Sequence, residues 1–177
     1  MREHQHALGV AIRTGATSFI VVPGKRDATV SHAGQMEHAV RFYRQLMPLC
    51  EAANVTLLFE PVRHQGSTTP MFLSSLDEVI ELCERLDHSH CRLLFDLYQQ
   101  HQHTPDLESA LVASSKWLGH VELGDSHGRK EPGTGEIDFS HICQLLQQFR
   151  YSGLLGLEHG TSLPGEQGEV GTSEFLS

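Results

Sequence analysis

Residues Gly119 to Asp138 have the sequence Gly-His-Val-Glu-Leu-Gly-Asp-Ser-His-Gly-Arg-Lys-Glu-Pro-Gly-Thr-Gly-Glu-Ile-Asp. It begins with a short apolar alternation, passes through charged residues and glycines, and ends in an Asp placed to cap an apolar helix. Glycine reaches backbone conformations closed to other residues, and fixed charged side chains need a partner. The stretch therefore predicts a strand that ends in a ligand-facing loop; a solvated connection is the alternative.

The same order of strand and helix recurs along the chain. Apolar or β-rich runs start near residues 18, 55, 92, 119 and 154, and amphipathic segments lie between them. Units of about 30 residues are typical of right-handed parallel βα repeats. Residues 7–14 look like the end of a helix that Gly15 closes.

Local signals predict several helix boundaries. Ser75 and Glu78 have capping-box spacing, and Asp138 precedes an apolar helix. Pro48 should kink or shorten the helix that carries it. Residues 98–103 are expected to be a polar loop.

Two further boundaries concern the second half of the chain. Thr104-Pro105 should begin a helix that runs to about Trp117. Residues 1–168 are expected to form one domain, and residues 169–177 a tail, within a stretch from residue 160 that is rich in glycine and poor in apolar periodicity.

Two α/β architectures fit this pattern, namely part of a (β/α)₈ TIM barrel or a five-stranded doubly wound sheet. Acids at the ends of four successive strands favour the barrel, since barrels build active sites there. A full barrel needs eight units and typically about 250 residues, whereas about five parallel strands are predicted here. We therefore expect that the first three units are missing, in a truncated product or a fragment. An open edge would make the piece unstable or lead to a homo-oligomer.

Composition narrows the class of protein. The net charge is −9 and the basic residues are scattered, so no nucleic-acid groove is predicted. No apolar run approaches the roughly 20 residues of a membrane span, and the N-terminus lacks a signal core. Cysteines within apolar segments indicate buried thiols and a cytoplasmic location; they are Cys50, Cys83, Cys91 and Cys143.

Four acids carry the predicted chemistry: Glu60, Asp96, Glu122 and Glu158, each at or near a strand end. Adjacent strands lie ~4.8 Å apart, so these carboxylates can converge, and a divalent cation would relieve their repulsion. Oxygen ligands favour Mg²⁺ or Mn²⁺, while Co²⁺ and Zn²⁺ remain compatible. Each acid alone is also compatible with a helix cap or an ion pair.

Such a site suits proton transfer next to a carbonyl, with Glu60 and Glu158 as the acid and base. Arg129 is a candidate for binding a substrate carboxylate or phosphate, or is a solvated surface residue. His120 and His127 are expected to be structural.

The strand-end motifs resemble the hydroxypyruvate isomerase branch of the xylose isomerase-like TIM barrels. They are Leu57-Leu58-Phe59-Glu60-Pro61, Phe95-Asp96-Leu97-Tyr98, Gly119-His120-Val121-Glu122, the loop from Gly128 to Asp138, and Gly156-Leu157-Glu158-His159. The resemblance covers residues 7–168. It implies a divalent metal on Glu60, Asp96, Glu122 and Glu158, and isomerisation of hydroxypyruvate or a similar sugar or hydroxy acid, or epimerisation of a small sugar.

Three departures from this branch bear on the substrate. Glu122 stands where Gln or His is usual, and Gln99, with His101 nearby, stands where a substrate-binding His is usual. The first three strands are absent. A remnant that binds metal without turnover is the second hypothesis, and metal-dependent hydrolysis is the third.

Overall fold

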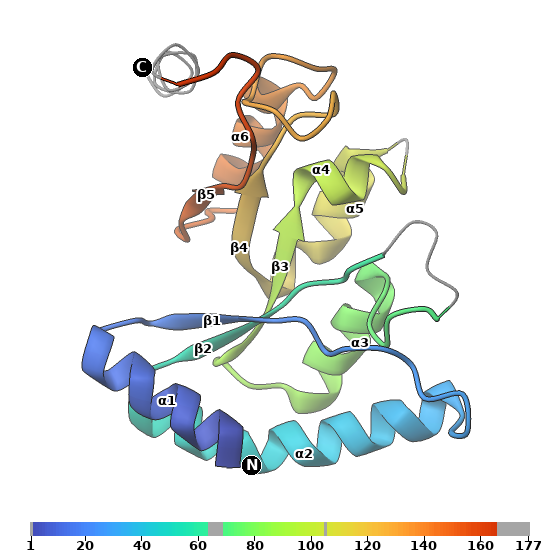
Figure 1. Ribbon diagram of the computed structural model, residues 1–177, viewed down its shortest axis with the longest axis vertical. Coiled ribbons are helices and arrows are strands. Elements are labelled where there is room, and N and C mark those ends of the chain that lie inside the picture. The colour runs from blue at the N-terminus through green and yellow to red at the C-terminus, as the bar shows by residue number, and fades with distance from the viewer. Residues whose placement is uncertain (1, 64–68, 105, 166–177) are drawn as a thin grey trace. The chain divides into compact units, whose positions relative to one another are not determined.

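Strands and helices alternate along the whole described chain (Figure 1). The computed structural model describes residues 2–63, 69–104 and 106–165. Five strands follow one another in the sheet order β1-β2-β3-β4-β5. Successive parallel strands joined by helices are the βα repeat of a barrel, so the prediction of an α/β fold with part of a (β/α)₈ barrel is confirmed.

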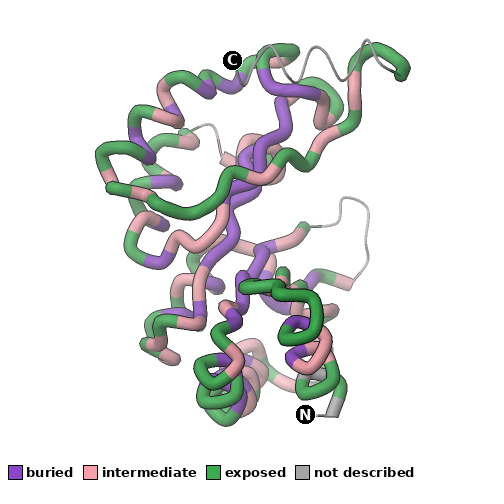
Figure 2. Tube along the Cα trace, turned by 90° about the vertical axis from the view of Figure 1, so that its left-hand side faces the viewer, coloured by how far each residue is buried: buried purple, intermediate pink, exposed green. Residues whose placement is uncertain are grey.

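The strands begin within one residue of the predicted starts. They are β1 Ser18–Val21, β2 Thr56–Phe59, β3 Cys91–Asp96, β4 Leu118–Leu123 and β5 Leu155–Leu157. Three of the four residues of β2 and five of the six residues of β3 are buried. Figure 2 shows this burial as purple segments of the trace. Apolar runs without alternation therefore mark strands that are covered on both faces.

The chain divides into two compact units, Met1–Leu94 and Phe95–Ser177. The first unit contains three helices: α1 Arg2–Thr14, α2 His32–Ala53 and α3 Leu76–Leu86. Helix α2 packs against α1, α3 and β2, and its buried stripe includes Met36, Val40 and Met47. The capping box of α3 is confirmed, because Ser75 Oγ accepts from Glu78 N and Glu78 accepts from Ser75 N.

Helix α2 differs from the prediction at Pro48. Of the two alternatives predicted for Pro48, a kink or a shorter helix, the shorter helix was wrong, since the helix continues to Ala53 and ends at Asn54 in the left-handed conformation. Proline removes one backbone donor, and the buried Met47 and Cys50 on either side keep this segment packed. Tertiary packing has outweighed the local helix-breaking signal.

The second unit contains α4 Leu97–His101, α5 Leu107–Ser114, the 3₁₀ helix η1 Ser115–Trp117 and α6 Phe139–Gln148. The prediction of a loop over residues 98–103 was wrong, because α4 occupies most of it. The cap of α5 is Asp106 and not Thr104, since Asp106 accepts from Ser109 N while Thr104 Oγ1 accepts from Asp106 N. Pro105 lies outside the described residues.

Other predictions for this unit agree with the structure. Asp138 caps α6 by accepting from His141 N at 2.9 Å. Residues 160–165 form neither helix nor strand, while the predicted boundary at residues 168 and 169 lies outside the described residues. None of the described helices has the length and apolar character needed to cross a membrane.

Candidate metal centre

The four predicted acids lie at the carboxyl ends of their strands. Glu60 follows β2, Asp96 ends β3, Glu122 is the fifth residue of β4, and Glu158 follows β5. Glu60, Asp96 and Glu122 are 8%, 1% and 5% exposed, whereas the Glu158 side chain is 52% exposed. Three acids are thus buried, which is costly for carboxylates without compensating charge.

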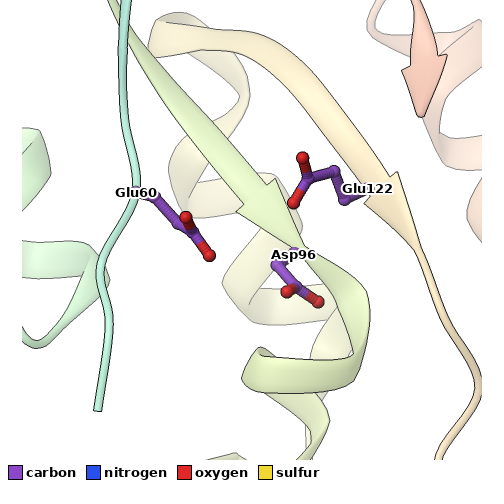
Figure 3. A group of neighbouring side chains, drawn as sticks. All are labelled: Glu60, Asp96 and Glu122. Carbon is purple, nitrogen blue, oxygen red and sulfur yellow. The ribbon is translucent and has the colours of Figure 1, made fainter. Parts of the chain in front are cut away.

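Asp96 and Glu122 form a buried pair within the second unit. Carboxylate oxygens of the two residues lie within 4.8 Å of each other, and Figure 3 shows both side chains at the ends of their strands. Glu60, also drawn in Figure 3, belongs to the first unit. Its backbone N–H donates to Val21 O at 3.1 Å, so Glu60 extends the pairing of β1 with β2 by one residue.

Asp96 is both the end of a strand and the cap of a helix. Oδ1 accepts from Gln99 N at 3.1 Å, and Oδ2 accepts from Gln99 Nε2 at 3.1 Å. Burial raises the pKa of Asp96 above its ordinary value, even though the Gln99 N–H and the Arg129 charge act in the opposite direction. The Asp96 carboxylate therefore lies where a further positive charge would stabilise it.

Arg129 bridges the ends of β3 and β5. Its Nη2 contacts Asp96 Oδ2 and lies 2.9 Å from Glu158 Oε2. Its Nε donates to the Glu158 backbone carbonyl at 3.0 Å, and its guanidinium lies 5.6 Å from the centre of the Tyr98 ring. Arg129, the candidate for binding substrate, thus lies at the site, and there it contacts the carboxylates of Asp96 and Glu158.

Gly124 makes this position of Arg129 possible. A Cβ at Gly124 would lie 2.9 Å from Glu158 O and 3.0 Å from Arg129 Cγ. Arg129 itself has a φ of 56°, which is uncommon for a residue other than glycine. Its carbonyl accepts from Gly160 N at 2.8 Å, so the backbone on both sides of the site is fixed.

The loop that carries Arg129 folds around one buried carboxylate, that of Asp125. Its side chain is fully buried and accepts four backbone N–H groups, from Ser126 at 2.7 Å, Gly133 and Gly135 at 2.8 Å, and Ile137 at 3.3 Å. Burial alone would raise the pKa of Asp125, but these donors outweigh it and lower the pKa. Sequence reasoning did not single out Asp125, although an Asp directly after a strand and before a glycine-rich loop is the signal for such a nest.

His120 lies beside the acids on β4. It shares a strand face with Glu122, and a Cβ at Gly156 would lie 2.6 Å from His120 Nε2 and 3.4 Å from Glu122 Cγ. Burial lowers the pKa of His120, so the ring is neutral at pH 7. The absence of a side chain at Gly156 on β5 therefore leaves room for the side chains of His120 and Glu122 on β4.

The remaining predicted residues have different positions. Gln99 lies at the site, where it donates twice to Asp96. His101 is the last residue of α4, and its Nδ1 is buried without a hydrogen-bond partner among the described residues. His127 is exposed and its Nδ1 lies 3.2 Å from Thr134 O, in keeping with a structural role.

The donor set of the second unit fits a divalent cation. Asp96, Glu122 and Glu158 bring three carboxylates to neighbouring strand ends, and Arg129 contributes a single positive charge there. Lys130, the next residue, donates instead to Thr161 O at 2.8 Å. Carboxylates gathered in this way can hold a divalent cation.

Comparison with known proteins agrees with this architecture. Residues 1–176 match the family described as xylose isomerase-like TIM barrel. The structure is similar to that of an AP endonuclease, family 2, from Brucella melitensis, with a TM-score of 0.87, 19% identity, and coverage of 98% of this chain and 67% of that one. It is also similar to a 3-keto-D-glucoside 4-epimerase from E. coli, with a TM-score of 0.79, 19% identity, and coverage of 97% and 66%.

The matches to curated proteins cover a smaller share of both chains. The hydroxypyruvate isomerase of Escherichia coli is 25% identical over 116 residues, which make up 65% of this chain and 44% of that enzyme. Across the first relatives, the chain spans about half the length, or less, of the proteins that it matches.

Proposed function

Because the chain belongs to the xylose isomerase-like TIM barrel family, we propose that it is a divalent-metal-dependent isomerase acting next to a carbonyl. The substrate class is a small sugar or hydroxy acid such as hydroxypyruvate. The observation that carries this proposal is the convergence of two buried acids, since carboxylate oxygens of Asp96 and Glu122 lie within 4.8 Å of each other.

The cation is held by the four strand-end acids, Glu60, Asp96, Glu122 and Glu158. Support comes from the strand order, in which β2, β3, β4 and β5 are successive neighbours. Carboxyl ends of successive parallel strands meet at one edge of a sheet, where barrel enzymes build their sites. Glu60, Asp96 and Glu122 are the group drawn in Figure 3. A bound Mg²⁺ or Mn²⁺ supplies polarisation of the carbonyl and the adjacent hydroxyl.

Residues of the chain transfer the protons and bind the substrate. One of Glu60 and Glu158 takes the carbon-bound proton, and the other returns a proton to the neighbouring carbon. Arg129 binds the carboxylate of the substrate in a bidentate contact, with Gln99 and His101 beside α4 as further contacts. Neutral His120 shares a strand face with Glu122 and can donate or accept one hydrogen bond there.

A direct assay is the interconversion of hydroxypyruvate and tartronate semialdehyde in D₂O, followed by NMR. The account expects turnover that depends on added Mg²⁺ or Mn²⁺ and incorporation of deuterium at the exchanging carbon. Glu60→Gln and Glu158→Gln should each lower kcat by about 100-fold or more. Glu84→Gln, an exposed change on α3, should leave kcat unchanged. Turnover that survives both site substitutions would refute the acid and base assignment.

Epimerisation of a small sugar is the second candidate, because two carboxylates on opposite sides of one carbon can exchange its proton from either face. Product analysis separates the two reactions, since an epimerase inverts one centre and leaves the carbonyl in place. Metal binding without any turnover would instead identify a non-catalytic remnant.

A further inference from the structure

The Arg129 guanidinium makes the contacts that a cation would make at the ends of β3 and β5. We propose that Arg129 is a built-in competitor of the metal: it neutralises Asp96 and Glu158 until a divalent cation displaces it, and only then is it released to bind substrate. This inference rests on the proposed metal site and adds an order of events to it.

Competition follows from the oxygen atoms involved. Asp96 Oδ2 already accepts from Gln99 Nε2 and from Arg129 Nη2, and Oδ1 accepts from Gln99 N. A carboxylate oxygen has two lone pairs, so Oδ2 has no site left for a cation while Arg129 is in place. A cation that uses Oδ2 must therefore break the contact with Arg129.

Arg129 also contacts the carboxylate of Glu158. Its Oε2 lies 2.9 Å from the nitrogen that contacts Asp96, so one Nη2 serves both carboxylates. A cation between these acids would also lie within a few ångströms of the guanidinium, beside the buried Asp96, and the two like charges would repel. Arg129 and a metal that uses Asp96 Oδ2 therefore compete by position and by charge.

The loop allows the side chain to leave while the backbone stays. The Arg129 carbonyl accepts from Gly160 N, and Asp125 N donates to Lys130 O at 2.9 Å, which fixes the chain on both sides. The Tyr98 ring lies 5.6 Å from the guanidinium, a contact in addition to those with the two carboxylates. Displacement therefore needs rotation of the Arg129 side chain, which also breaks the hydrogen bond from Nε to the Glu158 carbonyl.

The consequence is a fixed order of binding at this site. A substrate carboxylate competes poorly for Arg129 while two protein carboxylates hold it, whereas cation binding frees it. Metal binding should thus precede substrate binding, and Arg129 is a residue that sets metal affinity as well as substrate affinity.

The test is isothermal titration calorimetry of Mn²⁺ with wild type, Arg129→Gln and Arg150→Gln. Arg150 is a matched control, because it is exposed and has a φ of 55°, close to that of Arg129. Loss of the competing ion pair should make Arg129→Gln bind Mn²⁺ roughly tenfold more tightly, while Arg150→Gln should match wild type. Equal or weaker affinity in Arg129→Gln overturns the inference and leaves the proposed function intact. Absence of Mn²⁺ binding in all three proteins overturns both.

A second measurement uses the unchanged protein. The Arg129 Nε–H donates to the Glu158 carbonyl, so its NMR resonance should be distinct from those of mobile arginines and absent in Arg129→Gln. Saturation with diamagnetic Mg²⁺ should move this resonance to the position of a mobile arginine. A resonance that stays in place at saturating Mg²⁺ overturns the inference.

Discussion

The backbone N–H of Gly135 donates to Asp125 Oδ2 at 2.8 Å, and a Cβ at Gly135 would lie 2.3 Å from Oδ1 of the same carboxylate. Glycine is therefore required by the close approach of the loop to the buried acid. We expect Gly135→Ala to lower the free energy of unfolding by about 2 kcal/mol, as overpacking of a fixed site does. Urea denaturation measures this change.

The control for this substitution is Gly9→Ala in α1. There the new Cβ would meet no neighbour closer than 3.5 Å, and alanine favours a helix over glycine by up to about 1 kcal/mol. Gly9→Ala should therefore be neutral or stabilising. Equal effects of the two substitutions would show that the Asp125 nest does not constrain Gly135.

Asp125 also predicts a dependence of stability on pH. Its pKa is lower in the folded protein than its ordinary value, which is about 3.9 in the unfolded chain. The stabilisation is therefore fully present above about pH 4 and is lost as the pH falls through the folded pKa. Asp125→Asn should lower the free energy of unfolding by about 3 kcal/mol at pH 7, since it leaves buried donors unpaired.

The difference between wild type and Asp125→Asn should shrink in urea titrations below about pH 4. Asp138→Asn is the control, because Asn caps a helix about as well as Asp. A difference that is constant from pH 7 to pH 2 would contradict the account of the Asp125 carboxylate.

The sequence predicted strands and helices well because their signals are local. Apolar runs of β2 and β3, the capping box of Ser75 and the cap at Asp138 all depend on residues a few positions apart. The predictions failed where a long-range or competing contact determines whether a segment is helical. Helix α2 passes Pro48 because buried neighbours hold it, and α4 forms because the strand-end acid Asp96 also caps a helix.

At the candidate site, too, features with local signals could be predicted and features that depend on long-range contacts could not. Strand-end positions of the acids could be predicted from the repeat, since each follows an apolar run. The bridging position of Arg129 could not, because it depends on how the loop folds back to Glu158. Asp125 does have a local signal, since it follows a strand and precedes a glycine-rich loop, but its donors lie up to 12 residues away.

His120 should titrate below the ordinary range of histidine. Burial lowers its pKa, and Gly156 leaves space for the ring against β5. NMR titration of the ring protons should therefore give a pKa for His120 below about 6.5. A value at or above 6.5 in the metal-free protein would contradict the described environment of His120.

Exposed apolar strands predict self-association. In the first unit, Ile20 and Val22 at β1 are 53% and 46% exposed; in the second unit, Leu155 and Leu157 of β5 are 43% and 42% exposed. Open strand edges with apolar side chains pair with other chains. Sedimentation velocity should detect concentration-dependent oligomers, which Leu155→Lys should reduce. Val112→Lys, at a 47% exposed helical position, is the control, and a wild-type monomer at all concentrations would contradict the prediction.

Binding of one divalent cation by the strand-end acids can be measured by calorimetric titration with Mn²⁺ of Asp96→Asn, with Asp106→Asn as the control. Both residues cap helices in the same way, Asp96 for α4 and Asp106 for α5, so both substitutions preserve a cap. The account predicts one Mn²⁺ per chain in wild type and in Asp106→Asn, and binding weakened by about 100-fold or more in Asp96→Asn. Unchanged affinity and stoichiometry in Asp96→Asn would contradict it.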